Sequence, residues 1–245
     1  MSILKKLNMF FKYGYKRDNS SLIKHLKNKG IKIGENVVFF SPEQSNIDTQ
    51  YPFLITIGND VYISAGIRIL THDYSWSVLK REYGEILGSS GNVTVGNNVF
   101  MGADVTLLRN TKIGDNVIIG AGSLVTSEIP SNSVAVGRPA KVVMSIEEFY
   151  QKRKGLQLSE AENLFKSYYD RYHTIPKKEV FREYFFLFEG KYDDLSDSLK
   201  DVLKRGGLAY EKKSIDALNE NKPLFNGYEE FVLHCKKKLG DLNHG

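Results

Sequence analysis

The sequence predicts a mainly β protein built on a parallel β-helix, with helical segments at both ends. The first observation is that Val95–Pro130 divides into six hexapeptides, VGNNVF, MGADVT, LLRNTK, IGDNVI, IGAGSL and VTSEIP, each with an aliphatic first residue. The second is that the same phase occurs at 57–74, as IGNDVY, ISAGIR and ILTHDY. A period of six fits neither an amphipathic helix nor a simple strand. It fits a three-faced coil of about 18 residues that turns a corner after each hexapeptide.

The composition is that of an ordinary globular protein. Hydrophobic residues make up 41% of the 245 positions and charged residues 26%. The single cysteine, Cys235, excludes an internal disulfide framework and favours a reducing, cytoplasmic location. No run approaches the ~20 apolar residues of a membrane-spanning helix, and lysines interrupt the N-terminal apolar run, which makes it a poor signal peptide.

The segment 1–32 holds the basic surplus, nine Lys and Arg against Asp18 alone. Apolar residues recur there at helical spacing, from Ile3 to Phe11 and again from Leu22 to Leu26. This segment could touch a charged glycan or the anionic surface at the inner face of the membrane, or it could cap the β-helix. We favour the cap, because a solenoid otherwise exposes the sheet edges of its first coil. No nucleic-acid reader motif accompanies the basic residues, so nucleic acid is not an expected partner.

We expect the β-helix to occupy residues 33–144. It begins with IGENV at Ile33, a pattern that occurs again as IGDNV at Ile113, and continues through an irregular stretch at 39–56. After the coil at 57–74 the phase breaks for the twenty residues 75–94. Loops of this length are usually functional or disordered, and this one is too rich in large apolar side chains to be disordered. We expect the loop to pack on a neighbouring subunit.

Residues 145–245 predict a helical region that buries aromatic side chains. Capping-box patterns at Ser145–Glu148 and Ser159–Glu162 predict the starts of two helices. Pro176 precedes a third predicted helix that reaches Phe188, and further helices are expected near 194–204 and 227–239. Nothing in this region suggests catalysis, and a packing appendage is the interpretation we favour.

His72 is the single histidine of the β-helix, and it lies at the root of the inserted loop. A surface histidine at a coil corner is the plain alternative to a functional one. The long loop and the chain's one tryptophan beside it favour a site. Its neighbour Asp73 is a weak candidate for orienting the ring, because adjacent residues of an extended chain point to opposite sides. The orienting partner is left unassigned.

Residues 33–144 resemble the hexapeptide-repeat acyltransferases, in particular the galactoside and maltose acetyltransferases and bacterial polysaccharide O-acetyltransferases. The resemblance rests on ITIGNDV at 55–61, on the Thr71–His72 pair before a loop, and on the long motif at 93–143. The flanking regions hardly share it. It implies a left-handed β-helix and a homotrimer, with active sites in grooves between neighbouring subunits.

The same resemblance implies acetyl-CoA as acyl donor and His72 as general base. A hydroxyl attacks a thioester poorly unless its proton is accepted during the attack, and an imidazole suits that task near neutral pH. The proton can then return to the departing CoA sulfur, so that no covalent enzyme intermediate is needed. The backbone amide of Ala103 is the implied oxyanion donor. The implied cofactor-binding residues are Ala103, Gly120, Ala121, Thr126, Arg138 and Lys141.

The loop supplies the candidates for acceptor binding, because its aromatic side chains could stack on a sugar. Trp76 could also donate its indole N–H to the oxyanion. The candidate acceptor-binding residues are Asp73, Tyr74, Trp76 and Tyr83.

These observations favour an acetyl-CoA-dependent O-acetyltransferase that acts on a sugar hydroxyl of a capsule, a lipopolysaccharide or a precursor of either. An N-acetyltransferase of an amino sugar nucleotide and a non-catalytic, structural β-helix remain as alternatives. A zinc hydratase of the same fold is excluded, because zinc needs about three ligands, commonly histidines, and residues 33–144 offer one His and no Cys. We therefore expect no metal.

Overall fold

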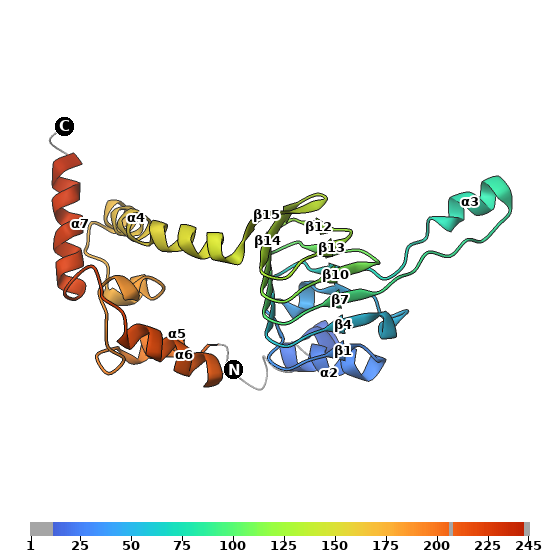
Figure 1. The fold of residues 1–245 in the computed structure, drawn as a ribbon, viewed down its shortest axis with the longest axis horizontal. Helices are drawn as coiled ribbons and strands as arrows, with labels where there is room; N and C mark the ends of the chain where they lie inside the picture. The colour runs from blue at the N-terminus through green and yellow to red at the C-terminus, as the bar shows by residue number, and fades with distance from the viewer. Residues whose placement is uncertain (1–11, 206–207, 243–245) are drawn as a thin grey trace. The chain divides into compact units, whose positions relative to one another are not determined.

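The computed structural model describes residues 12–205 and 208–242. The chain divides into two units, Met1–Phe149 and Tyr150–Gly245, and each has its own hydrophobic core. The first unit is built on short β-strands and the second is helical (Figure 1). Within the described residues, no helix combines the length and the apolar character needed to cross a bilayer.

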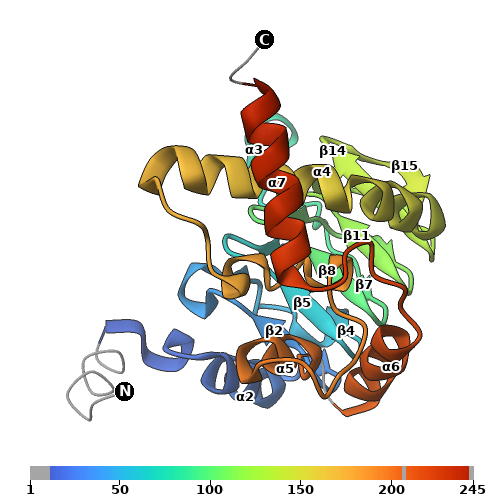
Figure 2. The same cartoon turned by 90° about the vertical axis from the view of Figure 1, so that its left-hand side faces the viewer.

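The first unit winds through three sheets in turn, so that strands three apart in the sequence are hydrogen-bonded neighbours. All strand pairings are parallel except that of the last two strands, β14 (Ser133–Gly137) and β15 (Ala140–Ser145). Figure 2 shows β5 (Val61–Ile63), β8 (Val99–Met101) and β11 (Val117–Ile119) side by side. This order confirms a parallel coil with three faces, and its left-handed sense stays a prediction. Sheet A holds β1 (Lys32–Ile33), β4 (Ile55–Ile57), β7 (Val93–Val95), β10 (Thr111–Ile113) and β13 (Glu128–Ile129). Sheet B holds β2 (Val38–Phe39), β5 (Val61–Ile63), β8 (Val99–Met101), β11 (Val117–Ile119), β14 (Ser133–Gly137) and β15 (Ala140–Ser145). Sheet C holds β3 (Asn46–Ile47), β6 (Arg68–Ile69), β9 (Thr106–Leu107) and β12 (Leu124–Val125).

The strand register confirms the repeat and its interruption. Val93 pairs with Thr111, which follows it by one full coil of three hexapeptides. On its other side Val93 pairs with Ile55, which precedes it by one coil plus the twenty inserted residues. The loop therefore leaves the coil and returns to it without shifting the register of the strands.

The hexapeptide positions explain how the core is filled. The first position of every hexapeptide from Val95 to Val125 is at most 1% exposed, so the aliphatic series forms the interior stack. Corner residues such as Asn98 and Asn116 adopt left-handed backbone conformations, with φ of 52° and 56°, which asparagine tolerates better than most residues. Their side-chain amides are joined along the coil, Asn98 Nδ2 donating to Asn116 Oδ1 at 2.9 Å. The I-G-x-N-V pattern therefore marks a corner of the coil, with its asparagine in the left-handed conformation.

Helix α2 (Asn19–Lys29) covers the first coil. Asp18 caps its N-terminus by accepting a hydrogen bond from the Ser21 N–H at 2.8 Å, and Gly30 ends it with φ of 106°. Leu22 and Leu26 are each 1% exposed and belong to the core of the coil. The role of residues 1–32 as a cap stays a prediction. The predicted helical face from Ile3 to Phe11 lies outside the described residues.

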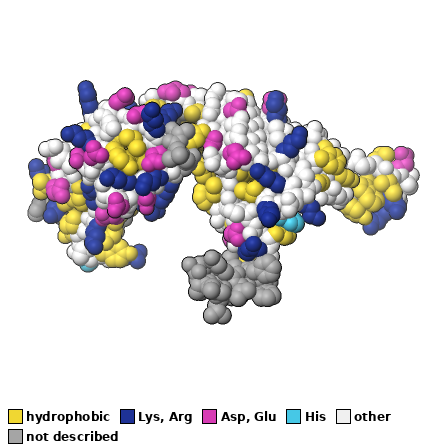
Figure 3. Space-filling view, turned by 90° about the horizontal axis from the view of Figure 1, so that it is seen from below, with side chains coloured by type: hydrophobic (Ala, Val, Ile, Leu, Met, Phe, Trp, Pro, Cys, Tyr) yellow, Lys and Arg dark blue, Asp and Glu magenta, His cyan; other side chains and the backbone are white. Residues whose placement is uncertain are grey.

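The inserted residues 75–94 form an arm that projects from the coil and carries α3 (Trp76–Tyr83) (Figure 1). The sequence had predicted a loop here, without a helix. The root of the arm is closed by a bridge between His72 and Ser90 and by a hydrogen bond from the Gly91 N–H to the Thr71 carbonyl at 2.9 Å. Figure 3 shows hydrophobic side chains gathered over the projection. Those at least half exposed are Tyr74, Val78, Tyr83, Ile86 and Leu87.

The helical unit departs from two of the predictions. The capping box at Ser145 is present, since Glu148 Oε2 accepts from the Ser145 N–H at 2.7 Å. The second predicted helix start, at Ser159, is wrong because the helix runs on through it and the Ser159 hydroxyl turns back to the Leu156 carbonyl. The third predicted helix, up to Phe188, is wrong because its aromatic residues pack inward from short 3₁₀ turns.

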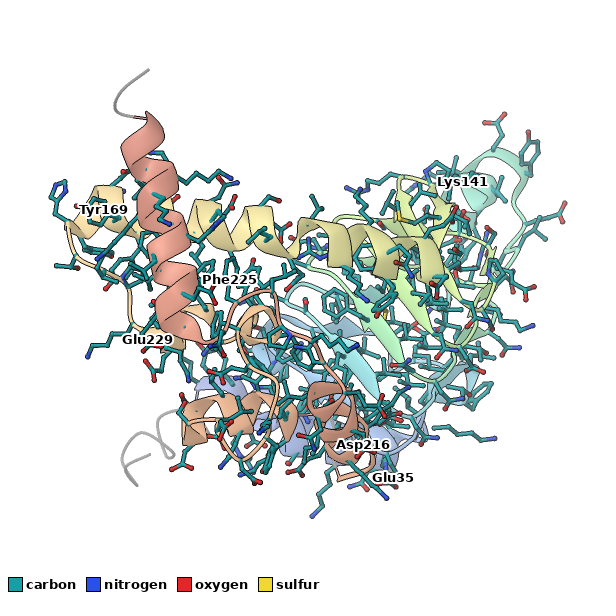
Figure 4. All side chains as sticks on the ribbon, turned by 60° about the vertical axis from the view of Figure 1, so that its left-hand side comes forward. Glu35, Lys141, Tyr169, Asp216, Phe225 and Glu229 are labelled. Carbon is teal, nitrogen blue, oxygen red and sulfur yellow. The ribbon has the colours of Figure 1, made fainter. Side chains whose placement is uncertain are left out.

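The helices expected near 194–204 and 227–239 are confirmed, and one between them was not anticipated. Phe165, Phe181 and Phe231 are fully buried at the centre of this unit, and Phe225 packs edge-on against Phe231 (Figure 4). The elements are α4 (Ile146–Tyr172), η4 (Lys178–Phe181), η5 (Phe185–Leu187), α5 (Asp197–Leu203), α6 (Leu208–Asn219) and α7 (Tyr228–Leu242).

Candidate active site

His72 is paired with a carboxylate that the sequence did not single out. Asp48 follows β3 and His72 follows β6, and these two strands are neighbours in sheet C, so both residues emerge at the same corner of the coil. His72 Nδ1 lies 2.5 Å from Asp48 Oδ2. The Asp48 side chain is 7% exposed and that of His72 is 30% exposed. The pair therefore joins a buried anion to an imidazole that solvent can reach.

Asp48 is held by a set of hydrogen bonds to both of its oxygens. The Thr71 N–H donates to Oδ2 at 3.2 Å and the Thr71 hydroxyl also donates to it. The Gln50 N–H donates to Oδ1 at 2.9 Å. Burial by itself raises the pKa of Asp48, but the hydrogen bonds from Thr71, Gln50 and His72 outweigh burial and hold that pKa below its ordinary value. Asp48 is consequently a carboxylate at neutral pH.

The carboxylate decides which nitrogen of His72 can act as a base. An ionised carboxylate only accepts hydrogen bonds, so the hydrogen between the two groups belongs to Nδ1. Neutral His72 then carries its lone pair on Nε2. A hydrogen-bonded carboxylate of this kind also favours the imidazolium that forms when Nε2 takes a proton. The arrangement is that of an oriented general base.

A second residue beside His72 was also missed. The ring of Tyr51 meets the His72 ring edge-on, with centroids 5.3 Å apart and planes at 82°. Both Asp48 and Tyr51 belong to the stretch at 39–56 that reads as irregular in the sequence. The first coil is longer than three hexapeptides, as the pairing of Asn46 with Arg68 shows. A strict six-residue count therefore cannot align Asp48 with His72. A signal was nevertheless present, because an acidic residue follows the strand one coil before the strand that leads to His72.

The structure directs Asp73 away from the role of orienting His72. Its carboxylate accepts hydrogen bonds from the Ser75 N–H at 3.0 Å and the Ser75 hydroxyl at 2.5 Å. Its other oxygen lies 3.4 Å from Arg109 Nε, on the following coil, and Arg109 also donates to the Ser89 hydroxyl. The hydrogen bonds from Ser75 lower the pKa of Asp73 below its ordinary value. Asp73 thus fastens the root of the arm.

Of the aromatic acceptor-binding candidates, Trp76 and Tyr83 lie on the arm and Tyr74 immediately precedes it. Tyr74 and Trp76 pack against each other with ring centroids 4.4 Å apart. Tyr74 is 68% exposed, and Tyr83, at the end of α3, is 70% exposed. In a single chain the arm extends outward from the coil (Figure 1).

Most of the cofactor-binding candidates lie in one row along the corner between sheets B and C. Gly122 donates its N–H to the Ala103 carbonyl at 2.7 Å, so the corners of two successive coils are stacked. A β-carbon on Gly102 would lie 2.5 Å from the Ala121 nitrogen, which shows how closely these corners approach. The next layer is the β14–β15 hairpin, which carries Lys141 (Figure 4). Lys141 pairs with Val136, whose side chain lies beside Gly120. Arg138 lies exposed at the tip of that hairpin.

Thr126 and His72 lie at the other end of sheet C. Both follow a strand of that sheet, whereas Ala103 precedes one. Six residues of extended chain separate the two corners, a span of about 15–20 Å at ~3.3 Å per residue. A single chain therefore does not bring His72 and Ala103 together. Across residues 12–205 and 208–242, the His, Cys, Asp and Glu side chains form no group of three that could hold a metal ion.

Residues 92–127 match the family model described as bacterial transferase hexapeptide (six repeats). The protein CapG of Staphylococcus aureus is 37% identical over 127 residues, which are 52% of this chain and 73% of CapG. The galactoside O-acetyltransferase of Escherichia coli is 36% identical over 118 residues, 48% of this chain and 55% of that protein. The chain thus spans only about half the length of the latter relative.

Solved structures give partial matches of the same kind. A maltose O-acetyltransferase from Clostridium difficile aligns over 59% of this chain and 89% of its own, with 23% identity and a TM-score of 0.37. A galactoside acetyltransferase in complex with coenzyme A aligns over 59% of this chain and 80% of its own, with 26% identity and a TM-score of 0.42. Because the hexapeptide model matches within the coil and CapG is matched over nearly three quarters of its length, the chain belongs to the bacterial hexapeptide transferase family.

Proposed function

We propose that this protein is an acetyl-CoA-dependent O-acetyltransferase that acts on a sugar hydroxyl of a cell-surface polysaccharide, a capsule or lipopolysaccharide, or of its precursor. The observation that carries the proposal is the Asp48–His72 pair, a buried carboxylate 2.5 Å from an imidazole at the root of the arm. Membership of the hexapeptide transferases supports the donor, and the similarity to a galactoside O-acetyltransferase supports a sugar hydroxyl as acceptor.

In the proposed mechanism, His72 Nε2 takes the proton of the acceptor hydroxyl while the hydroxyl oxygen attacks the thioester carbonyl. Asp48 stays ionised and stabilises the imidazolium, and the N–H of Ala103 stabilises the oxyanion. When the C–S bond breaks, the CoA thiolate recovers the proton from Nε2. Cys235 is no rival nucleophile, because it is 2% exposed and burial raises the pKa of its thiol to about 12.

We propose that the chemistry needs two protomers of a left-handed β-helical homotrimer. Within one chain, His72 and the row that contains Ala103 lie at opposite ends of sheet C. A groove between neighbours could unite them. The apolar side chains exposed on the arm support such contact, because contiguous exposed apolar surface commonly marks an interface.

The small residues at the stacked corners suit the thin pantetheine arm of CoA. Gly120 and Ala121 would line it and Thr126 would contact it. Arg138 and Lys141 would meet the nucleotide phosphates, Lys141 as a point charge rather than a bidentate partner. On the acceptor side, Asp73, Tyr74, Trp76 and Tyr83 would reach the sugar from the arm.

We propose residues 33–144 as the catalytic domain, residues 1–32 as its cap and residues 145–245 as a packing appendage. The membrane contact considered for residues 1–32 is not part of the proposal. Leu22 and Leu26 are the apolar residues of α2 that would have to enter a bilayer, and both are buried in the core of the coil.

The test is the His72→Ala variant, assayed by thiol release from acetyl-CoA with a panel of pyranosides. Its kcat should fall by about 10² or more, while CoA still raises the melting temperature as it does in the wild type. The matched control is His25→Ala, a histidine of α2 stacked on Tyr15, whose turnover should match the wild type. A His72→Ala enzyme that keeps the wild-type rate would remove His72 as the base.

Two alternatives are separated by the same assay. Transfer to an amino sugar nucleotide but to no hydroxyl acceptor would make the protein an N-acetyltransferase. A non-catalytic β-helix predicts that CoA produces no thermal shift. An enzyme should gain ~2.7 kcal/mol of stability when CoA is present at a hundred times its dissociation constant.

A further inference from the structure

Tyr51, whose ring meets that of His72, and Phe53, whose ring lies next to Tyr51, take no part in the mechanism above. We propose that Tyr51 and Phe53 form an acceptor shelf, a wall on which a pyranose ring lays its apolar C–H face while one of its hydroxyls meets His72. The shelf belongs to the segment 48–54 rather than to the arm. This inference rests on the proposed function and names the part of the site that selects the sugar.

The shelf is fixed at both ends. At its start, the Gln50 N–H donates to Asp48 Oδ1 at 2.9 Å, so the carboxylate that orients His72 also holds the first turn of the segment. At its end, Ile55 enters β4 and is fully buried. A rigid wall binds a ligand with less loss of conformational entropy than a mobile loop does.

The middle of the segment is equally constrained. Pro52 begins the 3₁₀ turn η3 (Pro52–Leu54), and the Leu54 N–H donates to the Tyr51 carbonyl at 3.0 Å. The ring of Pro52 lies against Gly30, at the end of α2, 3.7 Å from where a β-carbon would stand. The backbone between Tyr51 and Phe53 is therefore braced by the N-terminal cap.

Three rings lead from the base to solvent. The His72 and Tyr51 centroids are 5.3 Å apart, and those of Tyr51 and Phe53 are 6.2 Å apart with planes at 68°. Tyr51 is partly buried, whereas Phe53 is 71% exposed. An acceptor hydroxyl must come within about 3 Å of Nε2 to give up its proton. The sugar ring that bears it then lies within reach of the rings that neighbour the imidazole.

The chemistry of the shelf suits a sugar better than a flat apolar ligand. The negative face of an aromatic ring attracts the weakly positive C–H groups of a pyranose, and the Tyr51 hydroxyl can donate to or accept from a neighbouring sugar hydroxyl. One exposed phenylalanine is ordinary on a protein surface. What distinguishes Phe53 is its connection, through one ring, to the proposed base.

The experiment compares steady-state kinetics of Phe53→Ala, Phe53→Leu and Phe53→Tyr with those of the wild type. The acceptor KM should rise about tenfold in Phe53→Ala and Phe53→Leu, the size of one lost ring contact, and should stay within about twofold in Phe53→Tyr, which keeps the ring. The KM for acetyl-CoA should not change in any of the three. The matched control is Tyr172→Ala in the helical unit, an aromatic residue that is 62% exposed and lies 4.7 Å from the Tyr168 ring, and it should alter neither KM.

An unchanged acceptor KM in Phe53→Ala, or a raised KM for acetyl-CoA instead, would overturn the shelf. So would a Tyr83→Ala variant that raises the acceptor KM while Phe53→Ala does not, because acceptor selection would then belong to the arm.

Failure of the proposed function would look different. In that case the wild type transfers acetyl to none of the pyranosides, and saturation-transfer NMR with methyl pyranosides in the absence of acetyl-CoA decides the shelf. Signals of the sugar C–H protons that appear with the wild type and Tyr172→Ala but vanish with Phe53→Ala would support a sugar-binding shelf. Signals that are absent from the wild type, or equal in Phe53→Ala, would overturn it.

Discussion

Among single residues, Asp48 makes the largest difference to the chemistry. Without it, His72 would be a corner histidine with either nitrogen protonated. With it, the hydrogen is placed on Nδ1 and the lone pair on Nε2, because the carboxylate can only accept. Thr71 is fully buried and joins Asp48 through its backbone and its hydroxyl, so the site shares its fixed geometry with the core of the coil.

We predict that Asp48→Asn lowers kcat about tenfold or more, because a neutral amide no longer fixes the hydrogen on Nδ1 of His72 and no longer stabilises the imidazolium that forms during the attack. The measurement is kcat at saturating acceptor and acetyl-CoA. The matched control is Asp170→Asn in the helical unit, an exposed carboxylate that pairs with Lys166, and it should keep the wild-type kcat. A wild-type kcat in Asp48→Asn would contradict the assignment.

Thr71→Val separates the structural role of Asp48 from its effect on His72. The change removes the hydroxyl donor at nearly constant volume and leaves the Asp48–His72 pair in place. We predict a loss of about 1 kcal/mol in the free energy of unfolding with a smaller fall in kcat than Asp48→Asn shows, measured by denaturation and by the same assay. An equal fall in kcat in Thr71→Val would mean that the loss in Asp48→Asn reports general loosening of the corner.

Among the elements, α4 and α7 are tied by a charged cluster at the edge of the aromatic core. Glu162 Oε1 lies 2.7 Å from His234 Nε2, and Lys238 pairs with the other oxygen. The Glu162 side chain is 11% exposed. Burial raises the pKa of Glu162, but its hydrogen bonds with His234 and Lys238 outweigh burial and leave that pKa below its ordinary value. A carboxyl with a depressed pKa stabilises the fold above its ordinary pKa, and the contribution is lost as the pH falls through the depressed value.

We predict that Glu162→Gln lowers the unfolding free energy of the helical unit by about 1–2 kcal/mol at pH 7, and that this difference from the wild type shrinks below about pH 4. Urea denaturation followed by far-ultraviolet circular dichroism at both pH values measures it. The control is Asp170→Asn, which breaks the exposed pair of Lys166 with Asp170 and should cost about 0.5 kcal/mol or less. A Glu162→Gln penalty that is the same at both pH values would show that its charge does not matter.

For the whole molecule, the arm is the feature that a single chain leaves unexplained. It carries large apolar side chains away from the coil, and its root is fastened by Asp73, Arg109 and the bridge at His72. Because the root of the arm is held in place, its apolar surface can bind only a partner that occupies a fixed position. In a closed ring of identical subunits, the neighbouring copy of the chain always occupies the same position. The proposed trimer would cover this surface and complete the active site in one step.

We predict that the wild type has the mass of the proposed trimer and that the triple substitution Val78→Glu, Ile86→Glu and Leu87→Glu gives monomers, because the three exposed side chains would place charge in the proposed interface. Light scattering after size-exclusion chromatography measures the mass. Leu224→Glu, which replaces a side chain that is 65% exposed in the helical unit, should leave the mass unchanged. If the triple variant keeps the wild-type mass, the arm is not the interface.

The coil could be predicted from the sequence alone. Each face of the coil is one hexapeptide long and buries its first residue, so an apolar residue at every sixth position follows directly from the path of the backbone. The aliphatic positions from Val95 to Val125 and the twenty-residue interruption could both be located by counting, and His72 was found where the count stopped. Only the tertiary structure brought Asp48 and Tyr51 to His72, since the first coil carries extra residues and pairing across coils does not follow the period of six there. The helical unit was harder to predict for a related reason. The conformation of its aromatic segments depends on how their side chains pack around Phe231. That packing overrides local signals such as the capping pattern at Ser159.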